Sequence, residues 1–299
     1  MTKAYMQYDV DSDGILTATM DDADGRVNVM NGAFIDALKA LTQKLSEERD
    51  LYKGVILTSA KSTFFAGGDL QEILAITDET RDVYFEKVQL IKKHLRALET
   101  QDLPVVAAIN GAALGGGYEI CLSCHHRIAA KNPKTIIGVP EVTLGLLPGG
   151  GGVIRLTRLL GTKAALPILI TGKAFSPEES LANGMIDEIA EDNDDMFAKA
   201  KAWILSKPSY VQPWDKPDQS ASEDTLSDIQ KEFETRIEAG EFTSGPAPAT
   251  ILKCALESKP LDFATAMTLE SQYLTDLAVS PSAKEHISCL LYTSPSPRD

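Results

Sequence analysis

The sequence has few of the features that mark secreted, nucleic-acid-binding or membrane-spanning proteins. It contains only four cysteines in 299 residues and no apolar segment at its N-terminus, so we expect a cytoplasmic protein with reduced thiols. Acidic residues outnumber basic ones by 43 to 29, and the net charge of −14 opposes binding to nucleic acid and to anionic membranes. The most apolar stretch, 105–122, is interrupted by Asn110, Glu119 and several glycines, so no membrane span is predicted.

The sequence also lacks the common motifs of metal, nucleotide and serine-hydrolase sites. Its four histidines do not have the spacing of metal ligands, so no metal is expected. The segment Cys121-Leu-Ser-Cys124-His125 matches the pattern of c-type haem attachment, but that chemistry needs an export route, and we interpret the match as coincidence. Phosphate-binding, dinucleotide-binding and G-x-S-x-G patterns are missing as well, which leaves those three classes unsupported.

The apolar pattern predicts an α/β fold. Two short alternating runs, 5–10 and 14–20, are separated by Asp13-Gly14, which predicts a β-hairpin because Asp-Gly supplies the backbone angles of a tight turn. Asn31 is a predicted helix cap after this hairpin. The spacing further predicts buried strands at 54–59 and 105–109, a short strand at 185–190, and helices near 78–99, 163–170 and 177–183.

The composition changes near residue 208, where prolines and polar residues predict a linker. We therefore predict a domain at 1–206, a linker at 207–221, a helical region at 222–288 and a tail at 289–299. The final residues, 290–299, carry prolines without helical periodicity. We expect them to be disordered and not to continue the preceding helix, and an origin outside the native protein is an open alternative.

Three short motifs stand out together. They are Phe64-Phe65-Ala66-Gly67-Gly68-Asp69-Leu70, the segment 110–119 (NGAALGGGYE) and the segment 140–149 (PEVTLGLLPG). A glycine-rich run alone is more often a turn or a close-packing device than an anion site, and a glutamate on a helix is usually solvated. Glu119, however, lies in an apolar run and follows Gly116 by three residues, which places its carboxylate on the same side of a helix as that amide.

The order and spacing of these motifs resemble the crotonase superfamily, over residues 5 to 206. The resemblance implies a spiral of ββα units with a helical C-terminal extension. It also implies that the amides of Gly68 and Gly116 form an oxyanion hole, and that Glu119 and Glu141 are the catalytic carboxylates. A developing enolate oxygen is stabilised by such fixed N–H donors.

The same resemblance implies an enoyl-CoA hydratase that adds water to trans-2-enoyl-CoA to give 3-hydroxyacyl-CoA in fatty-acid β-oxidation. Isomerases of the family commonly retain only the later glutamate, so the presence of both favours a hydratase. The alternatives are a Δ3–Δ2-enoyl-CoA isomerase and a non-catalytic acyl-CoA-binding relative. Ala66 and Leu70 are expected to line the CoA site and Arg26 to lie near a phosphate, while no further cofactor is expected because coenzyme A is part of the substrate.

Residues 211–215 (VQPWD) and the helices after them resemble the connecting region of multifunctional fatty-acid oxidation proteins. In those proteins an NAD-dependent 3-hydroxyacyl-CoA dehydrogenase domain follows. The resemblance implies that the chain is the N-terminal hydratase part of such a protein, truncated before that domain, with a thiolase partner or a homo-oligomeric assembly. Acyl chain length, stereochemistry and oligomeric state remain open from the sequence.

Overall fold

The computed structural model of the chain describes residues 4–206, 210–216, 226–242 and 245–293. It divides into two compact units. The first consists of Met1–Gly68, Leu90–Gly138 and Ala174–Gln219, and the second of Asp69–Gln89, Val139–Lys173 and Ser220–Asp299. The mixture of strands and helices confirms the predicted α/β class.

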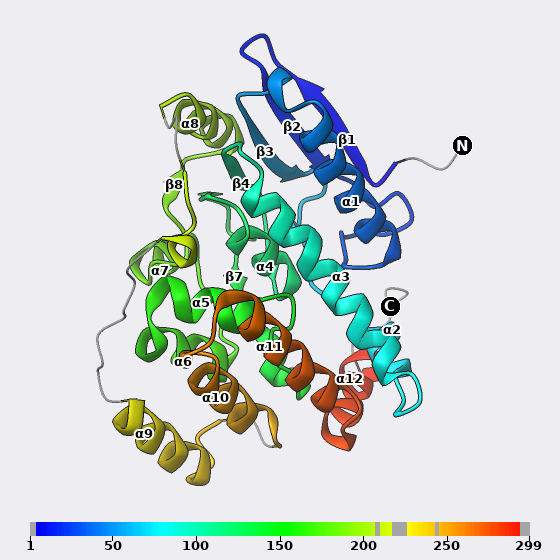
Figure 1. Ribbon diagram of the computed structural model, residues 1–299, viewed down its shortest axis with the longest axis vertical. Helices are drawn as coiled ribbons and strands as arrows, with labels where there is room; N and C mark the ends of the chain where they lie inside the picture. Colours follow the sequence, from blue (N-terminus) through cyan, green and yellow to red (C-terminus); the bar gives the residue numbers. More distant parts are fainter. Residues whose placement is uncertain (1–3, 207–209, 217–225, 243–244, 294–299) are drawn as a thin grey trace. The chain divides into compact units, whose positions relative to one another are not determined.

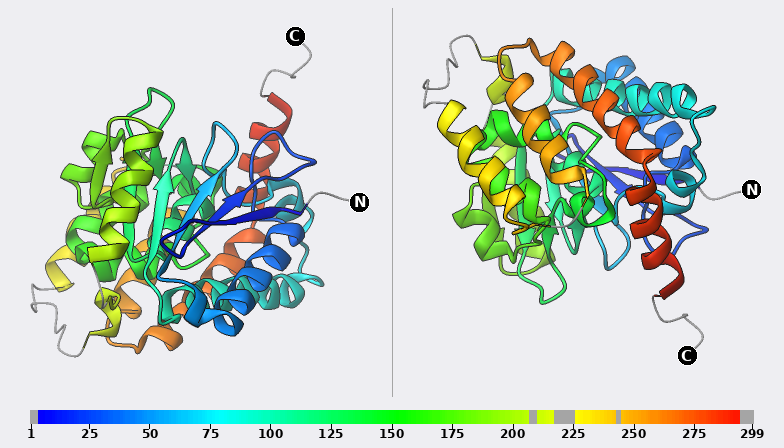
Figure 2. Two further views of the ribbon diagram at one scale, coloured as in Figure 1. Left: turned by 90° about the horizontal axis from the view of Figure 1, so that it is seen from above. Right: turned by 90° about the horizontal axis from the view of Figure 1, so that it is seen from below.

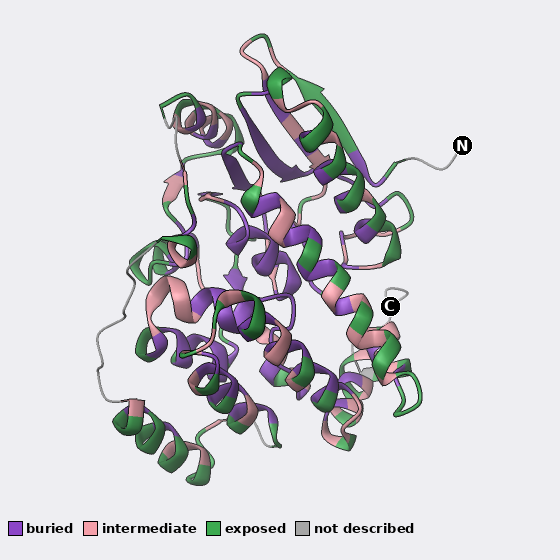
Figure 3. Cartoon of the chain, in the orientation of Figure 1, coloured by how far each residue is buried: buried purple, intermediate pink, exposed green. Residues whose placement is uncertain are grey.

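A six-stranded sheet forms the centre of the first unit (Figure 1). Its order is β1-β2-β3-β4-β6-β8, in which β1 is antiparallel to β2 and every other pair is parallel. The strands are β1 (Met6–Val10), β2 (Ile15–Met20), β3 (Gly54–Ser59), β4 (Val105–Ile109), β6 (His126–Ala130) and β8 (Glu188–Ala190). β3 and β4 are buried along their whole length, whereas β1 is an edge strand with four exposed residues (Figure 3).

A second, smaller ladder of parallel pairings accompanies this sheet. β5 (Ala113–Leu114) pairs with β7 (Ile137–Gly138), and isolated bridges join Phe65 to Ala113 and Met30 to Gly68. The passes through β2, β3, β4 and β6 thus each make a strand of the large sheet, then a pairing in the small ladder, and then a helical segment. This repeat is the predicted spiral of ββα units.

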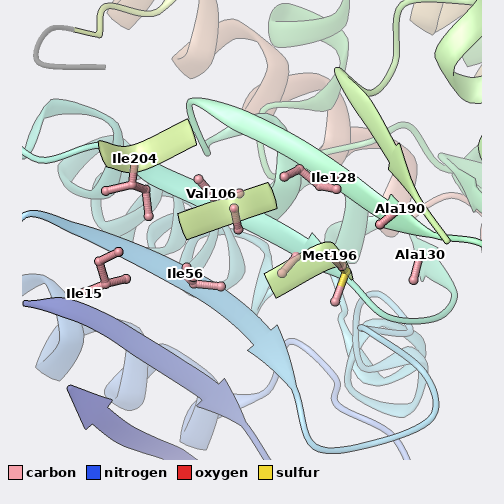
Figure 4. Packing of buried hydrophobic residues seen from close by; sticks show 10 residues of the cluster. Ile15, Ile56, Val106, Ile128, Ala130, Ala190, Met196 and Ile204 are labelled. Atoms are coloured by element: carbon pink, nitrogen blue, oxygen red, sulfur yellow. The ribbon is translucent and has the colours of Figure 1, made fainter. Parts of the chain in front are cut away.

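One face of the large sheet is covered by α8 (Asn193–Ser206), which contacts β3, β4, β6 and β8. Side chains from alternate strand positions and from one side of this helix form an apolar cluster (Figure 4). Its members are Ile15, Ile56, Val106, Ala108, Ile128, Ala130, Ala190, Met196, Ala200 and Ile204. The other positions of β3 and β4 are equally buried, so both faces of the sheet are covered, as a parallel sheet requires.

The remaining helices of the first unit follow the strands of the spiral. They are α1 (Gly32–Glu47), the last half of α3 (Arg81–Thr100), α4 (Gly116–Leu122) and α7 (Pro177–Ala182). The side chain of Asn31 accepts a hydrogen bond from the Phe34 amide, which confirms the predicted cap of α1.

The second unit is helical. α10 contacts α5, α6, α9 and α11, and α12 contacts α2, α11 and the 3₁₀ turn η2; α9, α10 and α11 lie side by side in the right view of Figure 2. The elements are α2 (Leu70–Ala75), η2 (Pro140–Leu144), α5 (Gly152–Leu160), α6 (Thr162–Thr171), α9 (Leu226–Glu238), α10 (Ala247–Glu257), α11 (Phe263–Ala278) and α12 (Pro281–Thr293). Close contact of Gly149 with Leu274, whose side chain would lie 2.1 Å from a Cβ at that glycine, packs the third motif against α11.

Several predicted boundaries were wrong or incomplete. The helix expected to stop before residue 290 continues to Thr293, so 289–293 are helical and not disordered, while 294–299 lie outside the described residues. Of the predicted linker, 207–209 and 217–221 also lie outside them, and the part between contains a short helical turn, η3 (Pro213–Asp215). α8 and β6 were not predicted. Among the described residues, no helix is both long enough and apolar enough to cross a bilayer.

Candidate active site

Backbone hydrogen bonds bring the first two sequence motifs together in the first unit. The Phe65 amide donates to the Ala112 carbonyl at 3.0 Å, and the Leu114 amide donates to the Phe65 carbonyl at 3.1 Å. On its other side, the first motif pairs with residues 28–30, where the Met30 amide donates to the Gly67 carbonyl at 2.9 Å. The segment 65–68 is therefore held between two parallel neighbours.

The glycines of the second motif let its backbone approach the first motif. A Cβ on Gly117 would lie 2.4 Å from the Phe65 carbonyl oxygen, and one on Gly111 would lie 2.1 Å from the Ser62 carbonyl oxygen. Both distances are shorter than any contact that a real side chain could make. The glycine run thus has the packing role that such runs usually have, in addition to any role at a ligand.

Gly68 and Gly116, the two predicted oxyanion donors, lie close to each other. The carbonyl carbon of Gly67, which is bonded to the Gly68 nitrogen, is 3.7 Å from the position that a Cβ on Gly116 would take. The preceding residues have backbone angles that favour glycine, with φ of 104° at Gly67 and 55° at Gly115. Within the described part of the chain, neither amide donates to another backbone carbonyl. For Gly116 this follows from its place as the first residue of α4.

Glu119 lies on α4 one turn beyond this pair of amides. Its own amide donates to the Gly115 carbonyl at 3.0 Å, and its residue is 3% exposed. Burial of a carboxylate costs free energy unless polar groups surround it. The buried position of Glu119, one turn along α4 from Gly116, therefore marks it as a candidate functional residue. The structure places the Gly67–Gly68 peptide close to Gly116, an approach that the family resemblance implied, and it places Glu119 one turn along α4 from Gly116, as their spacing predicted.

The two predicted CoA-contacting residues of the first unit are both exposed. The Ala66 amide donates to the Asn28 carbonyl at 2.9 Å, so the loop that carries Arg26 runs directly beside the first motif. Lys61 fixes this loop, because its Nζ donates to the carbonyls of Asp22 and Gly25 at 2.7 and 2.9 Å. Sequence reasoning missed Asn28 and Lys61, which are single polar residues with no local pattern.

The other two predicted site residues belong to the second unit. Glu141 is half-buried in η2, where the Leu146 amide donates to its carbonyl at 3.0 Å. The turn is packed closely, since a Cβ on Gly145 would lie 3.0 Å from the Cα of Ala283. Leu70 is half-buried and is the first residue of α2, whose N-cap is Asp69.

The Cys121–His125 segment has structural contacts that account for its residue types. Burial raises the pKa of the Cys121 thiol well above its usual value, so the thiolate is disfavoured. Nδ1 of His125 accepts from the Val105 amide and Nε2 lies 3.0 Å from the Glu99 carbonyl, which fixes a neutral ring. Burial lowers the pKa of His125 to about 4.

Residues 11–209 match the family described as Enoyl-CoA hydratase/isomerase. The chain therefore belongs to the enoyl-CoA hydratase/isomerase family.

Among curated relatives, the chain is 33% identical over 282 residues to the fatty acid oxidation complex subunit alpha of Shewanella halifaxensis, covering 90% of this chain and 38% of that protein. It thus spans well under half the length of that relative. Among solved structures, human mitochondrial Δ3–Δ2-enoyl-CoA isomerase superimposes with a TM-score of 0.68 at 22% identity, covering 97% of each chain. An enoyl-CoA hydratase from Bacillus halodurans gives 0.65 at 21% identity, covering 95% of this chain and 99% of that one. These two structures establish the fold.

Proposed function

We propose that the chain catalyses the reversible hydration of trans-2-enoyl-CoA to 3-hydroxyacyl-CoA in fatty-acid β-oxidation. In this reaction the oxygen of water bonds to C3 and a proton is delivered to C2, while negative charge builds up on the thioester oxygen. Catalysis therefore requires donors for that oxygen and acid–base groups beside C2 and C3.

The observation that supports the proposal most directly is the close approach of the Gly67–Gly68 peptide to Gly116, with buried Glu119 one turn away. Two amides fixed by backbone pairing need no rearrangement when charge develops, and loss of one such donor typically reduces turnover by ~10²–10³. We assign the thioester oxygen to the amides of Gly68 and Gly116.

We assign the acid–base chemistry to Glu119 and Glu141. One carboxylate orients and deprotonates the attacking water, and the other delivers the proton to C2, a contribution worth ~10²–10⁴ in rate. Family membership supports this assignment, and the presence of both glutamates favours hydration over double-bond isomerisation.

The test is an absorbance assay on purified protein, in which hydration of crotonyl-CoA removes the conjugated enoyl thioester. We expect activity in the unmodified chain and a loss of at least ~10² in kcat for Glu119→Gln and for Glu141→Gln, with acyl-CoA affinity largely retained. Asp69→Asn serves as a control, because this carboxylate caps α2 through the Gln71 and Glu72 amides and has no assigned part in the chemistry.

Other outcomes would reassign the activity. A protein that leaves crotonyl-CoA unchanged but converts a 3-enoyl-CoA to the 2-enoyl form is an isomerase. Inactivity on both substrates with retained acyl-CoA binding would identify a non-catalytic relative.

For substrate recognition, we propose that Ala66 and Leu70 line the CoA site and that Arg26 contacts a phosphate of the nucleotide. No additional cofactor enters the proposed reaction, so activity should survive exhaustive treatment with a chelator and should not require NAD.

The relative from Shewanella and the resemblance of residues 211–215 support a further proposal, that the chain corresponds to the hydratase part of a multifunctional subunit. That longer protein would also carry a 3-hydroxyacyl-CoA dehydrogenase, would assemble with a thiolase or as a homo-oligomer, and would act in the cytoplasm.

A further inference from the structure

Asn28 is a fully buried amide at the base of the first motif. It is 0% exposed, and its side chain connects three separate parts of the first unit. Nδ2 donates to Ser59 Oγ at 2.8 Å, to the Phe64 carbonyl at 3.2 Å and to the Met20 carbonyl at 3.4 Å, while Oδ1 accepts from the Asp22 amide at 2.9 Å. All polar atoms of the side chain are therefore in use.

The backbone of the same residue holds the first motif from its other end. The Asn28 carbonyl accepts from the Ala66 amide at 2.9 Å, so one residue contacts both Phe64 and Ala66. The Met30 amide continues the pairing to the Gly67 carbonyl, which belongs to the peptide that carries the Gly68 amide.

Ser59 extends this network along the loop before the motif. Its Oγ accepts from Asn28 Nδ2 and from the Lys61 amide at 3.0 Å, and it donates to the Thr63 carbonyl at 2.9 Å. Two buried side chains, those of Ser59 and Asn28, therefore hold the beginning and the end of the turn from β3 into the motif, residues 59–64.

We propose that Asn28 is a positioning residue that keeps the Gly68 amide in the geometry at which it donates to the thioester oxygen. The proposal rests on the proposed function and deepens it. Asn28 does not touch the reacting atoms. It acts through residues 64–68, because the hydrogen bonds that hold this segment on the side away from the second motif, among the described residues, come from Asn28 and from the Met30 amide.

A residue that only stabilises the fold would behave differently from a positioning residue. Loss of a buried hydrogen-bonding partner lowers the free energy of unfolding in either case. Only a positioning residue also lowers kcat in the folded protein, because a displacement near 1 Å at a catalytic group can reduce the rate by ~10².

The experiment compares Asn28→Ala and Ser59→Ala with Thr58→Val. Thr58 is a matched control, since it is equally buried on β3 and its Oγ1 donates to the Ala108 carbonyl at 3.0 Å, away from the motif. With crotonyl-CoA at saturation, we expect kcat to fall by about 10- to 100-fold in Asn28→Ala and by about 10-fold in Ser59→Ala. Thr58→Val should lose stability but keep kcat within about twofold, as expected for one lost hydrogen bond distant from the site.

A second readout follows the thioester directly. Butyryl-CoA labelled with ¹³C at the thioester carbonyl is bound to each protein, and the carbonyl stretching frequency is measured by infrared difference spectroscopy. Strong donors weaken the C=O bond, so the band should be lowered in the unmodified protein and should return toward its value in water in Asn28→Ala. Because the ligand is unreactive, this readout is independent of turnover.

Each result has one meaning. Inactive unmodified protein would defeat the proposed function, while a normal carbonyl shift that Asn28→Ala abolishes would still support the positioning role. An active protein in which Asn28→Ala and Ser59→Ala keep both kcat and the carbonyl shift would overturn the inference alone. If Asn28→Ala does not fold, Ser59→Ala decides by the same two criteria.

Discussion

Substitution of Gly117 by alanine is a sharp test of how the two motifs fit together. The new Cβ would lie 2.4 Å from the Phe65 carbonyl oxygen, against 3.4 Å for ordinary contact, so the segments must separate by about 1 Å. The obstacle is backbone rather than a flexible side chain, and Phe65 pairs with Ala113 in the small ladder. A displacement of the Phe65 backbone would therefore also move residues 66–68, which follow it in the chain.

We expect Gly117→Ala to lower kcat for crotonyl-CoA hydration by about 100-fold, because that is the typical effect of a 1 Å displacement at a catalytic group. Overpacking should also lower the free energy of unfolding by about 1–3 kcal/mol. Both quantities are measurable, by the absorbance assay and by urea unfolding followed by circular dichroism.

Gly32→Ala is the control, because a Cβ at Gly32 meets no atom within 4 Å and alanine favours the helix that starts there. It should leave kcat unchanged. A Gly117→Ala protein with normal kcat would refute the reasoning, since the motif could then move without affecting the chemistry.

Three further predictions concern recognition and stability. Arg26→Gln should raise KM for crotonyl-CoA several-fold at unchanged kcat, but should not affect crotonyl-pantetheine, which lacks the nucleotide phosphates. The pKa of His125 is lowered to about 4 from 6.5, so the unfolded chain binds more protons between these values. The free energy of unfolding should therefore fall by up to about 3 kcal/mol as the pH drops through this range, and urea titrations at pH 7 and 5 should show a smaller loss in His125→Gln. Gln212→Ala removes a buried donor to the Cys124 carbonyl and should cost about 1–2 kcal/mol in urea unfolding, whereas exposed Val211→Ala should cost nothing measurable.

Elements with a strong apolar pattern could be predicted from the sequence. β3 and β4 are continuous buried runs at the predicted positions, and the first hairpin and the cap at Asn31 were correct. The apolar pattern did not predict α8, because only three of its residues are buried and one of them, Ala200, contributes little to a hydrophobic pattern. The three are Met196, Ala200 and Ile204. β6 begins with His126 and Arg127, residues that do not suggest a strand.

The sequence likewise predicts only part of the candidate site. Gly116 and Glu119 lie in one short motif, so their spacing predicts that they are neighbours on a helix, whereas the approach of Gly68 to Gly116 was implied only by the family resemblance. The network beneath them could not be predicted, because Asn28 contacts Ser59 and Phe64 from 31 and 36 residues away. Such contacts join residues far apart in the sequence, so no local pattern indicates them.

The loop that carries Arg26 has a fixed base and an exposed tip. Lys61 and Asn28 anchor its two sides through main-chain groups, while Ala23, Asp24 and Arg26 face solvent. Substitutions at the tip should therefore change the free energy of unfolding little. Given the proposed contact of Arg26 with a phosphate of CoA, a change of acyl carrier would need only these few surface positions, and carrier preference would evolve separately from the chemistry.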